Sequence, residues 1–451
     1  MTSFAGRHVL VVGLGASGFG AAKALAELDA KVRVTELNDT PAARERAEVL
    51  RGDSVEVEIG EHDLDRLDAD LAILSPGIPP SAPIVGAIRG EHIEVWSEVE
   101  LAFRLARCDF LAVTGTNGKT TTTAMLGAIL AEAGIPSAAA GNIGWPLIDA
   151  VATIPEGGAI AAEVSSFQLA AIESFRPRIA VVLNIAEDHT DWHGSIDDYA
   201  AAKARIVANQ TTEDAFLPNA DDERAMAIAS TTAARVVPFS SSTQPAGGIG
   251  VRTGFIVREG VRFLAIDDVP IPGEAGLEDA VAAVGAALEY GVDTRAIARA
   301  VKSFRPLAHR LEVVARAEGI TYIDDSKATN PHATLAAVRG LNDVVLIAGG
   351  RSKGVDLTAL ARTVPPVVAV VALGEAREAV AQVFEGIASV EVVDTMEQAV
   401  RAARSKAKSG GSVLLSPGCA SLDMYESYSA RGEDFARCVR VELEGLPAEG
   451  R

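Results

Sequence analysis

The sequence predicts an α/β protein made of three consecutive domains. Short apolar runs alternate with helix-like segments along most of the 451 residues, which indicates parallel sheets with helices on both faces. Glycine-rich or polar loops follow several of these runs, at the sheet edge where such folds bind ligands. A chain of this length is typical of about three domains. We expect their boundaries at residues 1–107, 108–306 and 307–451.

The first domain begins as a Rossmann-like nucleotide-binding unit. A strand over 8–13 runs into the loop "GLGASG", and a helix follows over 18–28. The next strand, 31–36, ends at Glu36, where a carboxylate can meet a ribose. The remaining elements that we expect here are helices over 41–50 and 96–106 and a strand within 69–80. A lone glycine loop shows only that an anion can approach the backbone, so NAD and a nucleotide-sugar diphosphate both stay open.

The second domain begins with a strand over 110–115, the loop "GTNGKTTT" and a helix over 119–133. This arrangement is typical of a P-loop ATPase: backbone N–H groups at a helix N-terminus hold phosphates, Lys119 reaches their oxygens and Thr120 binds Mg²⁺. The loop departs from the usual P-loop pattern because Val113 occupies the position of its first glycine.

Acidic residues and a histidine follow two further strands of the second domain. Strand 158–165 carries Glu163 near its end, and strand 179–185 leads to Asp188 and His189. Strand ends of a parallel sheet share one edge, so a magnesium site beside the P-loop is favoured. Lys203 lies on an alanine-rich helix, and its spacing alone indicates a surface lysine. Short β-rich runs over 235–272, helices over 277–290 and 294–304, and the helix breaker Pro306 complete the domain.

The third domain again alternates strands and helices and is expected to be Rossmann-like. The strands that we expect are 319–325, 343–350, 367–374, 390–393 and 412–417. Three of them lead into the polar loops "DDSKATN", "GGRSKG" and "SPGCASLDMY". Because parallel strands end at one edge, these loops would form a wall of an active site.

Composition limits the partners of the chain. Its 61 acidic and 41 basic residues give a net charge of −20, which disfavours nucleic acid and anionic lipid. No apolar run approaches the ~20 residues that span a bilayer. The three cysteines fit no zinc pattern and are expected to be buried free thiols. The opening residues show no signal peptide. We therefore expect a cytoplasmic protein, monomeric by default, without nucleic acid or a membrane span.

Taken together, the motifs resemble the ATP-dependent Mur ligases of bacterial peptidoglycan synthesis. Over essentially the whole chain they follow the family order: "GTNGKTTT", "GNIG", "EVSSFQL", "EDH", "YAAAKARI", "HRLE", "DDSKATN", "GGRSKG" and "LLSPGCASLDMY". The resemblance implies three domains with the ATPase in the middle, and ATP and Mg²⁺ as cofactors. It is strongest to the branch that adds D-glutamate to UDP-N-acetylmuramoyl-L-alanine through an acyl phosphate, releasing ADP and phosphate.

The resemblance also implies roles for particular residues. Contacts to uridine and its diphosphate are implied for Ala16, Ser17, Glu36, Ser75, Pro76 and Gly77. Contacts to the ATP phosphates are implied for Gly115, Thr116, Asn117, Gly118, Lys119, Thr120 and Thr121. Other contacts to the nucleotide are implied for Asp279, Arg310 and Asp325. The metal ligands are Thr120, Glu163, His189 and a carbamylated Lys203; with Lys119 in place of Thr120, the same residues are the catalytic set. Contacts to the muramoyl group are implied for Asn142, Ser165 and Gln168. Contacts to D-glutamate are implied for Lys327, Thr329, Lys353, Ser421, Leu422 and Tyr428.

Two departures from the family and three alternatives accompany this interpretation. Ala275 and Gly276 replace a His-Asn pair that helps to hold ATP in the family, with Asp279 in place of a later Asn, so the adenine contacts stay undefined. Tyr428 stands where a Phe is expected. The alternatives are a related ligase for another amino acid, a nicotinamide-dependent oxidoreductase, and a non-catalytic ATP-binding regulator.

Overall fold

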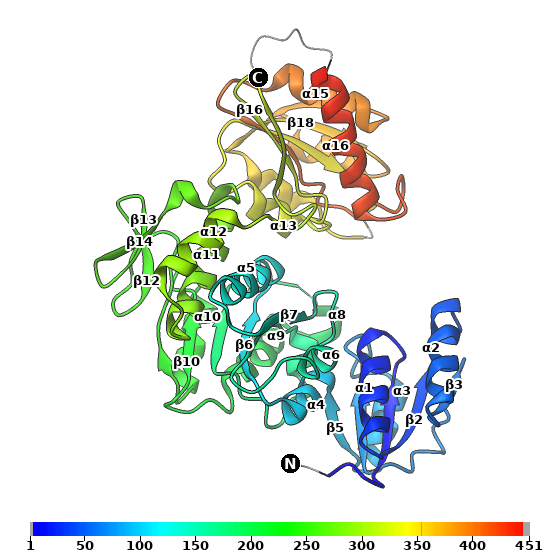
Figure 1. Ribbon diagram of the computed structural model, residues 1–451. Helices are drawn as coiled ribbons and strands as arrows, with labels where there is room; N and C mark the ends of the chain where they lie inside the picture. Colours follow the sequence, from blue (N-terminus) through cyan, green and yellow to red (C-terminus); the bar gives the residue numbers. More distant parts are fainter. Residues whose placement is uncertain (1–2, 189, 353, 445–451) are drawn as a thin grey trace. The chain divides into compact units, whose positions relative to one another are not determined.

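The structure, a computed structural model, describes residues 3–188, 190–352 and 354–444 (Figure 1). It divides into two compact units. One is Met1–Leu264 with Val281–Val301, and the other is Ala265–Ala280 with Lys302–Arg451. Each unit is an α/β arrangement, as the sequence predicts. Within the described residues, no helix has both the length and the apolar character that a membrane crossing requires.

The first sheet lies in the first unit and is wholly parallel. Its strands are β1 (His8–Val12), β2 (Lys31–Glu36), β3 (Glu56–Ile59), β4 (Leu71–Leu74) and β5 (Glu94–Ser97), in the order β3-β2-β1-β4-β5. Its helices are α1 (Ala16–Glu27), α2 (Pro41–Gly52), α3 (Pro83–Gly90) and α4 (Glu98–Leu105). The order reverses beside β1, so the glycine loop after β1 lies at the switch point where such sheets bind nucleotides.

The second sheet of this unit is also parallel. Its strands are β6 (Asp109–Thr114), β7 (Ser137–Gly141), β8 (Ala159–Glu163), β9 (Ile179–Val182), β10 (Ala215–Pro218) and β11 (Arg235–Val236), in the order β11-β10-β9-β6-β8-β7. Its helices are α5 (Lys119–Glu132), α6 (Leu147–Val151), α7 (Ser166–Leu169), α8 (Thr190–His193), α9 (Ile196–Ala204) and α10 (Glu223–Ala227), with short 3₁₀ turns at Arg205–Val207 and Ile228–Thr231. The P-loop therefore follows the central strand β6, between β8 and β9.

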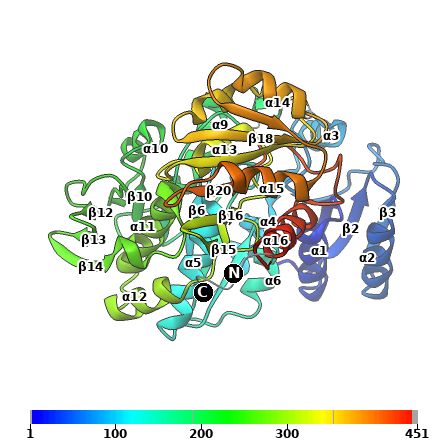
Figure 2. The ribbon, with the colours of Figure 1, turned by 90° about the horizontal axis from the view of Figure 1, so that it is seen from above.

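A small three-stranded sheet and two helices complete the middle of the chain. Strands β12 (Ile249–Arg252), β13 (Phe255–Arg258) and β14 (Val261–Ala265) form the sheet, and β12 runs antiparallel to β13. Figures 1 and 2 show these strands gathered beside β10. A 3₁₀ turn at Ile266–Asp268 leads to α11 (Gly273–Glu289) and α12 (Thr294–Ser303). The expected β-rich segment and both expected helices are confirmed.

The second unit contains the C-terminal sheet. Its strands are β15 (Glu312–Ala317), β16 (Ile320–Asp324), β17 (Val344–Gly349), β18 (Val367–Leu373), β19 (Ser389–Val392) and β20 (Ser412–Leu415), in the order β15-β16-β20-β17-β18-β19. Its helices are α13 (Pro331–Ala337), α14 (Arg377–Phe384), α15 (Met396–Lys406) and α16 (Tyr428–Glu444), with a 3₁₀ turn at Thr358–Thr363. Helices α15 and α16 lie side by side (Figures 1 and 2). The sheet is parallel except for the edge strand β15, which pairs antiparallel with β16.

Several elements differ from the sequence predictions. The helix expected over 96–106 is confirmed except at its ends: its first two residues, Trp96 and Ser97, belong to strand β5, and the helix begins at Glu98. Strands β3, β7, β10 and β15 and helix α3 were not predicted. The strand expected within 69–80 is short, since it ends at Leu74 before the Pro/Gly turn. Cys419 and Cys438 are buried free thiols as expected, whereas Cys108 is only half-buried.

A continuous apolar core joins the first two sheets. Beside it, the buried acid Glu100 of helix α4 binds the segment 173–175. The carboxylate of Glu100, with no exposed surface, accepts hydrogen bonds from the backbone N–H groups of Glu173 (2.9 Å), Ser174 (3.0 Å) and Phe175 (2.9 Å) and from Arg104 (2.6 Å). Burial alone would raise the pKa of Glu100, but the hydrogen bonds from Ser174, Glu173 and Arg104 outweigh it and hold this pKa below 4.5.

We expect Glu100→Ala to lower the free energy of unfolding by about 3–5 kcal/mol at pH 7, because five donors, the Ser174 hydroxyl included, lose a buried charged partner. Since the folded pKa is lowered, the stabilisation is present above the unfolded pKa and disappears as pH falls through the folded value. Urea unfolding at pH 7 and at pH 3 measures both effects, with the exposed Glu91→Ala as control. An unchanged midpoint at pH 7 would contradict this role of Glu100.

Candidate active site

The P-loop forms the start of helix α5. Gly118 takes a left-handed conformation (φ +82°) at the N-cap, where no side chain caps the helix, so its first backbone N–H groups face the loop. Asn184, after β9, accepts a hydrogen bond from Asn117 N on its side-chain oxygen (2.8 Å) and from Thr116 N on its carbonyl (2.8 Å). The neighbouring strand end therefore holds the loop in shape.

Lys119 and Lys203 meet at the P-loop backbone. Lys119 Nζ donates to the carbonyl oxygens of Gly115 and Thr116, both at 2.9 Å, and Lys203 Nζ donates to Gly115 O at 2.8 Å. Lys203 is 1% exposed, so its interpretation as a surface lysine is wrong. Burial, followed by the charge of Lys119, lowers the pKa of Lys203 well below 10.5. This lowered pKa favours the neutral, nucleophilic form of the amine over the form that an exposed lysine takes.

Acidic groups lie near this amine. The charges of Asp188 and Glu163 act on Lys203 and partly oppose the fall of its pKa. Glu163 is 2% exposed; one of its oxygens accepts from Asn142 Nδ2 at 3.0 Å, and the other, Oε2, has no hydrogen-bond partner among the described residues. A buried carboxylate oxygen without a partner is costly unless a cation or donor meets it. With the hydroxyl of the buried Thr120, this donor set fits a hard oxygen-seeking cation such as Mg²⁺.

Two residues of this site were not predicted. Asn184 holds the P-loop, and Tyr199 packs its ring 4.4 Å from Lys203 Nζ while its hydroxyl lies 3.3 Å from Thr116 Oγ1. Tyr199 precedes Lys203 by four residues on helix α9, so the two share a helix face. That spacing is the signal that could have found Tyr199. His189, expected to bind metal, lies outside the described residues.

The residues expected to hold a muramoyl group surround the end of β8. Gln168 and Ser165 form a capping box at the start of α7: Ser165 Oγ accepts from Gln168 N at 3.2 Å, and Gln168 Oε1 accepts from Ser165 N at 2.9 Å. Both side chains are buried, whereas Asn142 is exposed apart from its bond to Glu163. The structure therefore brings Asn142, Ser165 and Gln168 together with Glu163.

The residues expected to hold uridine lie around the glycine loop. Glu36 Oε2 accepts from Leu14 N at 2.7 Å, and Ser75 Oγ donates to Gly13 O at 3.3 Å. A Cβ at Gly18 would lie 2.0 Å from Gly13 O, so this close turn requires glycine. The other expected contacts, Ala16, Ser17, Pro76 and Gly77, are exposed or half-buried at the same sheet edge. Loop and helix N-terminus together can hold an anion.

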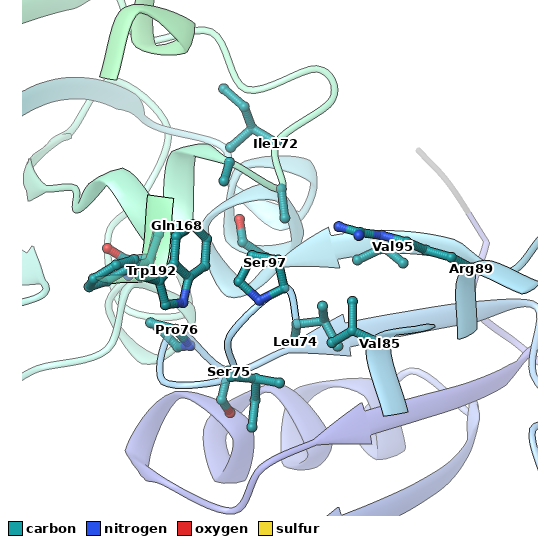
Figure 3. A pocket seen from close by; sticks show the side chains of 15 residues that line it. Leu74, Ser75, Pro76, Val85, Arg89, Val95, Ser97, Gln168, Ile172 and Trp192 are labelled. Atoms are coloured by element: carbon teal, nitrogen blue, oxygen red, sulfur yellow. The ribbon is translucent and has the colours of Figure 1, made fainter. Parts of the chain in front are cut away.

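One pocket joins the two sets of substrate residues. It measures about 270 Å³ and is lined by Ser75 and Pro76 from the first sheet and by Gln168 and Trp192 from the second. Figure 3 shows Gln168 and Trp192 beside each other, facing the turn that carries Ser75 and Pro76. Most of its other lining residues are apolar, with Arg89 as the single charged side chain among them. A lining with one positive charge and mostly apolar side chains favours a ligand that carries little charge at this position.

In the second unit, hydrogen bonds join the three polar loops that the sequence predicts at one edge. Asp325 Oδ2 accepts from Ser416 Oγ at 2.8 Å, and Gly418 N donates to Ala328 O at 2.9 Å. Arg351 pairs with Ala420 through two backbone hydrogen bonds of 2.8 and 3.0 Å. The loops "DDSKATN", "GGRSKG" and "SPGCASLDMY" therefore meet at one edge, as expected.

The individual residues of this edge differ in exposure. Burial raises the pKa of Asp325 to about 7. The hydrogen bond from Ser416 opposes this rise in the pKa. The ammonium of Lys327 lies 5.3 Å from the ring centre of Tyr428. Of the other expected residues, Ser421 is buried, Arg310 is half-buried, and Thr329 and Leu422 are exposed. Asp279 is buried too, but it lies in helix α11. Lys353 lies outside the described residues.

A buried arginine that was not predicted from the sequence joins two of these loops. Arg431 is 2% exposed and donates to Ser326 Oγ (2.9 Å), to Ser326 O (2.8 Å) and to Cys419 O (3.1 Å from each terminal nitrogen). Ser326 Oγ in turn donates to the carbonyl of Tyr428 at 2.8 Å. The guanidinium therefore fixes the loops that carry Lys327 and Ser421.

Comparison with known proteins gives the class that this fold and site define. The chain matches the "Mur ligase MurD-like, N-terminal domain" over residues 7–97, the "Mur ligase middle domain" over 113–287 and the "Mur ligase, glutamate ligase domain" over 309–419. The chain belongs to the Mur ligase family.

Relatives that match nearly the whole chain include proteins named UDP-N-acetylmuramoylalanine–D-glutamate ligase. The protein of Frankia casuarinae is 43% identical over 449 residues, covering 97% of this chain and 95% of the relative. That of Streptomyces coelicolor is 39% identical, with 97% and 99% covered, and that of Clostridioides difficile is 37% identical, with 95% and 97% covered.

Solved structures share the fold. MurF from Acinetobacter baumannii superimposes with a TM-score of 0.58 at 17% identity, over 90% of each chain. MurC from Thermotoga maritima gives 0.56 at 19% identity, over 97% of this chain and 99% of that one. At these identities the likeness supports the three-domain architecture alone.

Proposed function

We propose that this protein is an ATP-dependent ligase that joins D-glutamate to UDP-N-acetylmuramoyl-L-alanine during peptidoglycan synthesis, releasing ADP and phosphate. Relatives of that name cover nearly the whole chain at 37–43% identity. The observation that carries the mechanism is the P-loop with two lysines on its backbone and a buried carboxylate nearby. A nicotinamide-dependent oxidoreductase, the alternative from another class of enzyme, would not need this arrangement.

The reaction must activate a carboxylate that carries no leaving group. ATP supplies a phosphoryl group to the L-alanyl carboxylate, and the resulting acyl phosphate is attacked by the amine of D-glutamate, so that an amide forms and phosphate leaves. Both reactants of the first step are anionic, so bringing them together needs positive charge. Lys119 supplies such a charge, and the N–H groups at the start of α5 hold the phosphates.

The remaining roles follow from the chemistry of each group. Thr120, Glu163, His189 and Lys203, the last as a carbamate, would hold Mg²⁺, which adds further positive charge. Asn142, Ser165 and Gln168 would bind the muramoyl peptide, and the glycine loop with Glu36 and Ser75 the UDP moiety. Asp279, Arg310 and Asp325 would contact the nucleotide. Lys327, Thr329, Lys353, Ser421, Leu422 and Tyr428 would bind D-glutamate. We also propose a cytoplasmic monomer.

A screen of amino acids tests the substrate assignment. With ATP, Mg²⁺ and UDP-N-acetylmuramoyl-L-alanine, only D-glutamate is expected to give rapid ADP release and a lengthened nucleotide-sugar. L-Alanine, a diamino acid and a dipeptide serve as the comparison set for the other ligases of the family. If one of these compounds reacted as fast as D-glutamate or faster, the assignment of D-glutamate as the substrate would be wrong, while the ligase chemistry would still hold.

Lys353→Ala is expected to raise the KM for D-glutamate by about 10-fold or more, with less than a twofold change for ATP. D-Glutamate carries two carboxylates, and a lysine in the "GGRSKG" loop suits one of them, at a usual contribution of about 1.5–3 kcal/mol for a charged hydrogen bond. Steady-state kinetics measure both constants. Lys408→Ala, an exposed lysine before β20 at the opposite sheet edge, is the control. Equal changes for both substrates would argue against the assignment.

A further inference from the structure

Glu98 is a buried acid for which the proposed mechanism has no use. It is the first residue of α4, directly after strand β5 of the first sheet, and it is 1% exposed. Its Oε1 accepts a hydrogen bond from Ile148 N at 2.9 Å, at the start of α6, and its Oε2 lies 3.5 Å from Gln168 Nε2. One carboxylate of the first domain's last segment thus contacts two elements of the second.

The orientation of Gln168 directs its amide toward Glu98. Gln168 Oε1 already accepts from Ser165 N (2.9 Å) and Ser165 Oγ (3.0 Å), which fixes which end of the amide is the oxygen. The Nε2 donor must therefore point the other way, to Glu98. The backbone N–H of Ser97 also donates to Ala171 O at 2.8 Å, just after α7, and Figure 3 shows Ser97 and Gln168 at the same pocket.

The other contact of Glu98, with Ile148 N, leads to the segment that carries Asn142. Helix α6 follows the loop "GNIGWP" directly, and Asn142 in that loop donates to Glu163 Oε1 at 3.0 Å. Ile148 N, bound to Glu98, lies in the first turn of α6. Glu98 therefore contacts both segments that carry the expected muramoyl residues, Asn142 and Gln168.

Stability alone gives little reason for an acid at this position. Burial raises the pKa of Glu98 to about 7, although the N–H groups of Ile148 and Leu147 hold this pKa down, and the nearby Asp149 adds repulsion. A buried carboxylate is often less stabilising than a neutral group of the same shape.

We propose that Glu98 is a positioning residue for the nucleotide-sugar substrate, acting through Gln168 and the first turn of α6 to place the two muramoyl-binding segments. This inference rests on the proposed function. Two acceptor oxygens are needed, one for each segment, and a glutamine has only one. Glu98→Gln therefore keeps the shape and removes one of the two contacts.

The test compares binding constants for Glu98→Gln, Glu98→Ala and the exposed control Glu91→Ala. We expect Glu98→Gln to weaken binding of UDP-N-acetylmuramoyl-L-alanine, measured by calorimetry, about 10-fold, with the KM for ATP and D-glutamate changed less than twofold. The Tm should stay high enough for the variant to be fully folded at the temperature of the assay. Should Glu98→Ala fail to fold, Glu98→Gln still decides. The effects of Glu98→Gln and Gln168→Ala should be non-additive in the double variant, because one acts through the other.

Three outcomes would overturn the proposal: unchanged binding in Glu98→Gln, equal changes for all three substrates, or strictly additive effects with Gln168→Ala. Each of these outcomes is distinguishable from a failure of the proposed function. If the proposed function were wrong, the unmodified protein itself would neither bind the nucleotide-sugar nor release ADP in the presence of D-glutamate.

Discussion

Lys119→Ala is expected to lower ATP- and D-glutamate-dependent phosphate release by about 10³-fold or more. The ammonium lies on the P-loop backbone, 2.9 Å from the carbonyls of Gly115 and Thr116, where it can neutralise charge between a triphosphate and a carboxylate. Removing one preorganised charge from such a site typically costs two to five orders of magnitude in rate, by analogy with oxyanion donors and arginine fingers. Coupled detection of phosphate and ADP measures the loss.

Two controls make the Lys119 result specific. Lys31→Ala removes an exposed lysine at the start of β2 and should leave the rate within about twofold. Binding of the nucleotide-sugar to Lys119→Ala, measured by calorimetry, should stay near that of the unmodified protein, since the glycine loop lies on another sheet. Near-normal turnover of Lys119→Ala would refute the assignment of the P-loop.

Lys203→Ala and Lys203→Met are expected to lose most of the activity, about 10²-fold or more, because the proposed carbamate needs the amine. Burial and the charge of Lys119 lower the pKa of Lys203, which favours the neutral amine that can attack CO₂ with loss of a proton. In CO₂-free buffer the unmodified protein should also slow, and bicarbonate should restore it, whereas the two variants should not respond. Carbon-13-labelled bicarbonate and NMR detect the carbamate directly.

The same burial predicts an opposite effect on stability. In CO₂-free buffer the folded protein binds a proton at Lys203 less tightly than the unfolded chain does, so below pH 10.5 this lysine costs folding free energy. Lys203→Met should therefore be as stable as the unmodified protein or more so. The difference in the free energy of unfolding between Lys203→Met and the unmodified protein should become smaller as pH rises toward 10.5, where the lysine of the unfolded chain also loses its proton. A fully active Lys203→Met enzyme would remove the carbamate while leaving the ligase proposal intact.

Local sequence patterns were sufficient for most of the architecture. The strands β1, β6, β17 and β20 are apolar runs bounded by glycine or proline, and they were placed to within a few residues. Strand β7 was missed because "SAAAG" has little strand propensity and is fixed by pairing with β8. The start of the helix expected over 96–106 was placed two residues early because Trp96 and Ser97, the last residues of β5, continue its amphipathic pattern.

The site was predictable where one segment holds the chemistry and unpredictable where distant segments meet. The P-loop is continuous in sequence, so its position on a strand and a helix could be inferred. The burial of Lys203 could not, because Gly115 is 88 residues away. Glu98 and Glu100 have partners 50 to 75 residues away, and nothing in "WSEVELAF" separates them from surface acids. The glycine loop likewise could not distinguish NAD from a nucleotide-sugar, since both present a diphosphate to the same N–H groups.

The most direct test of the account is a stoichiometric one. The purified protein is incubated with ATP, Mg²⁺, UDP-N-acetylmuramoyl-L-alanine and D-glutamate, and ADP and the nucleotide-sugar are separated by chromatography and weighed by mass spectrometry. We expect one ADP for each nucleotide-sugar lengthened by a glutamyl residue, and neither product when any one substrate is omitted. Protein that is folded by circular dichroism and forms no ADP and no lengthened nucleotide-sugar would contradict the central claim.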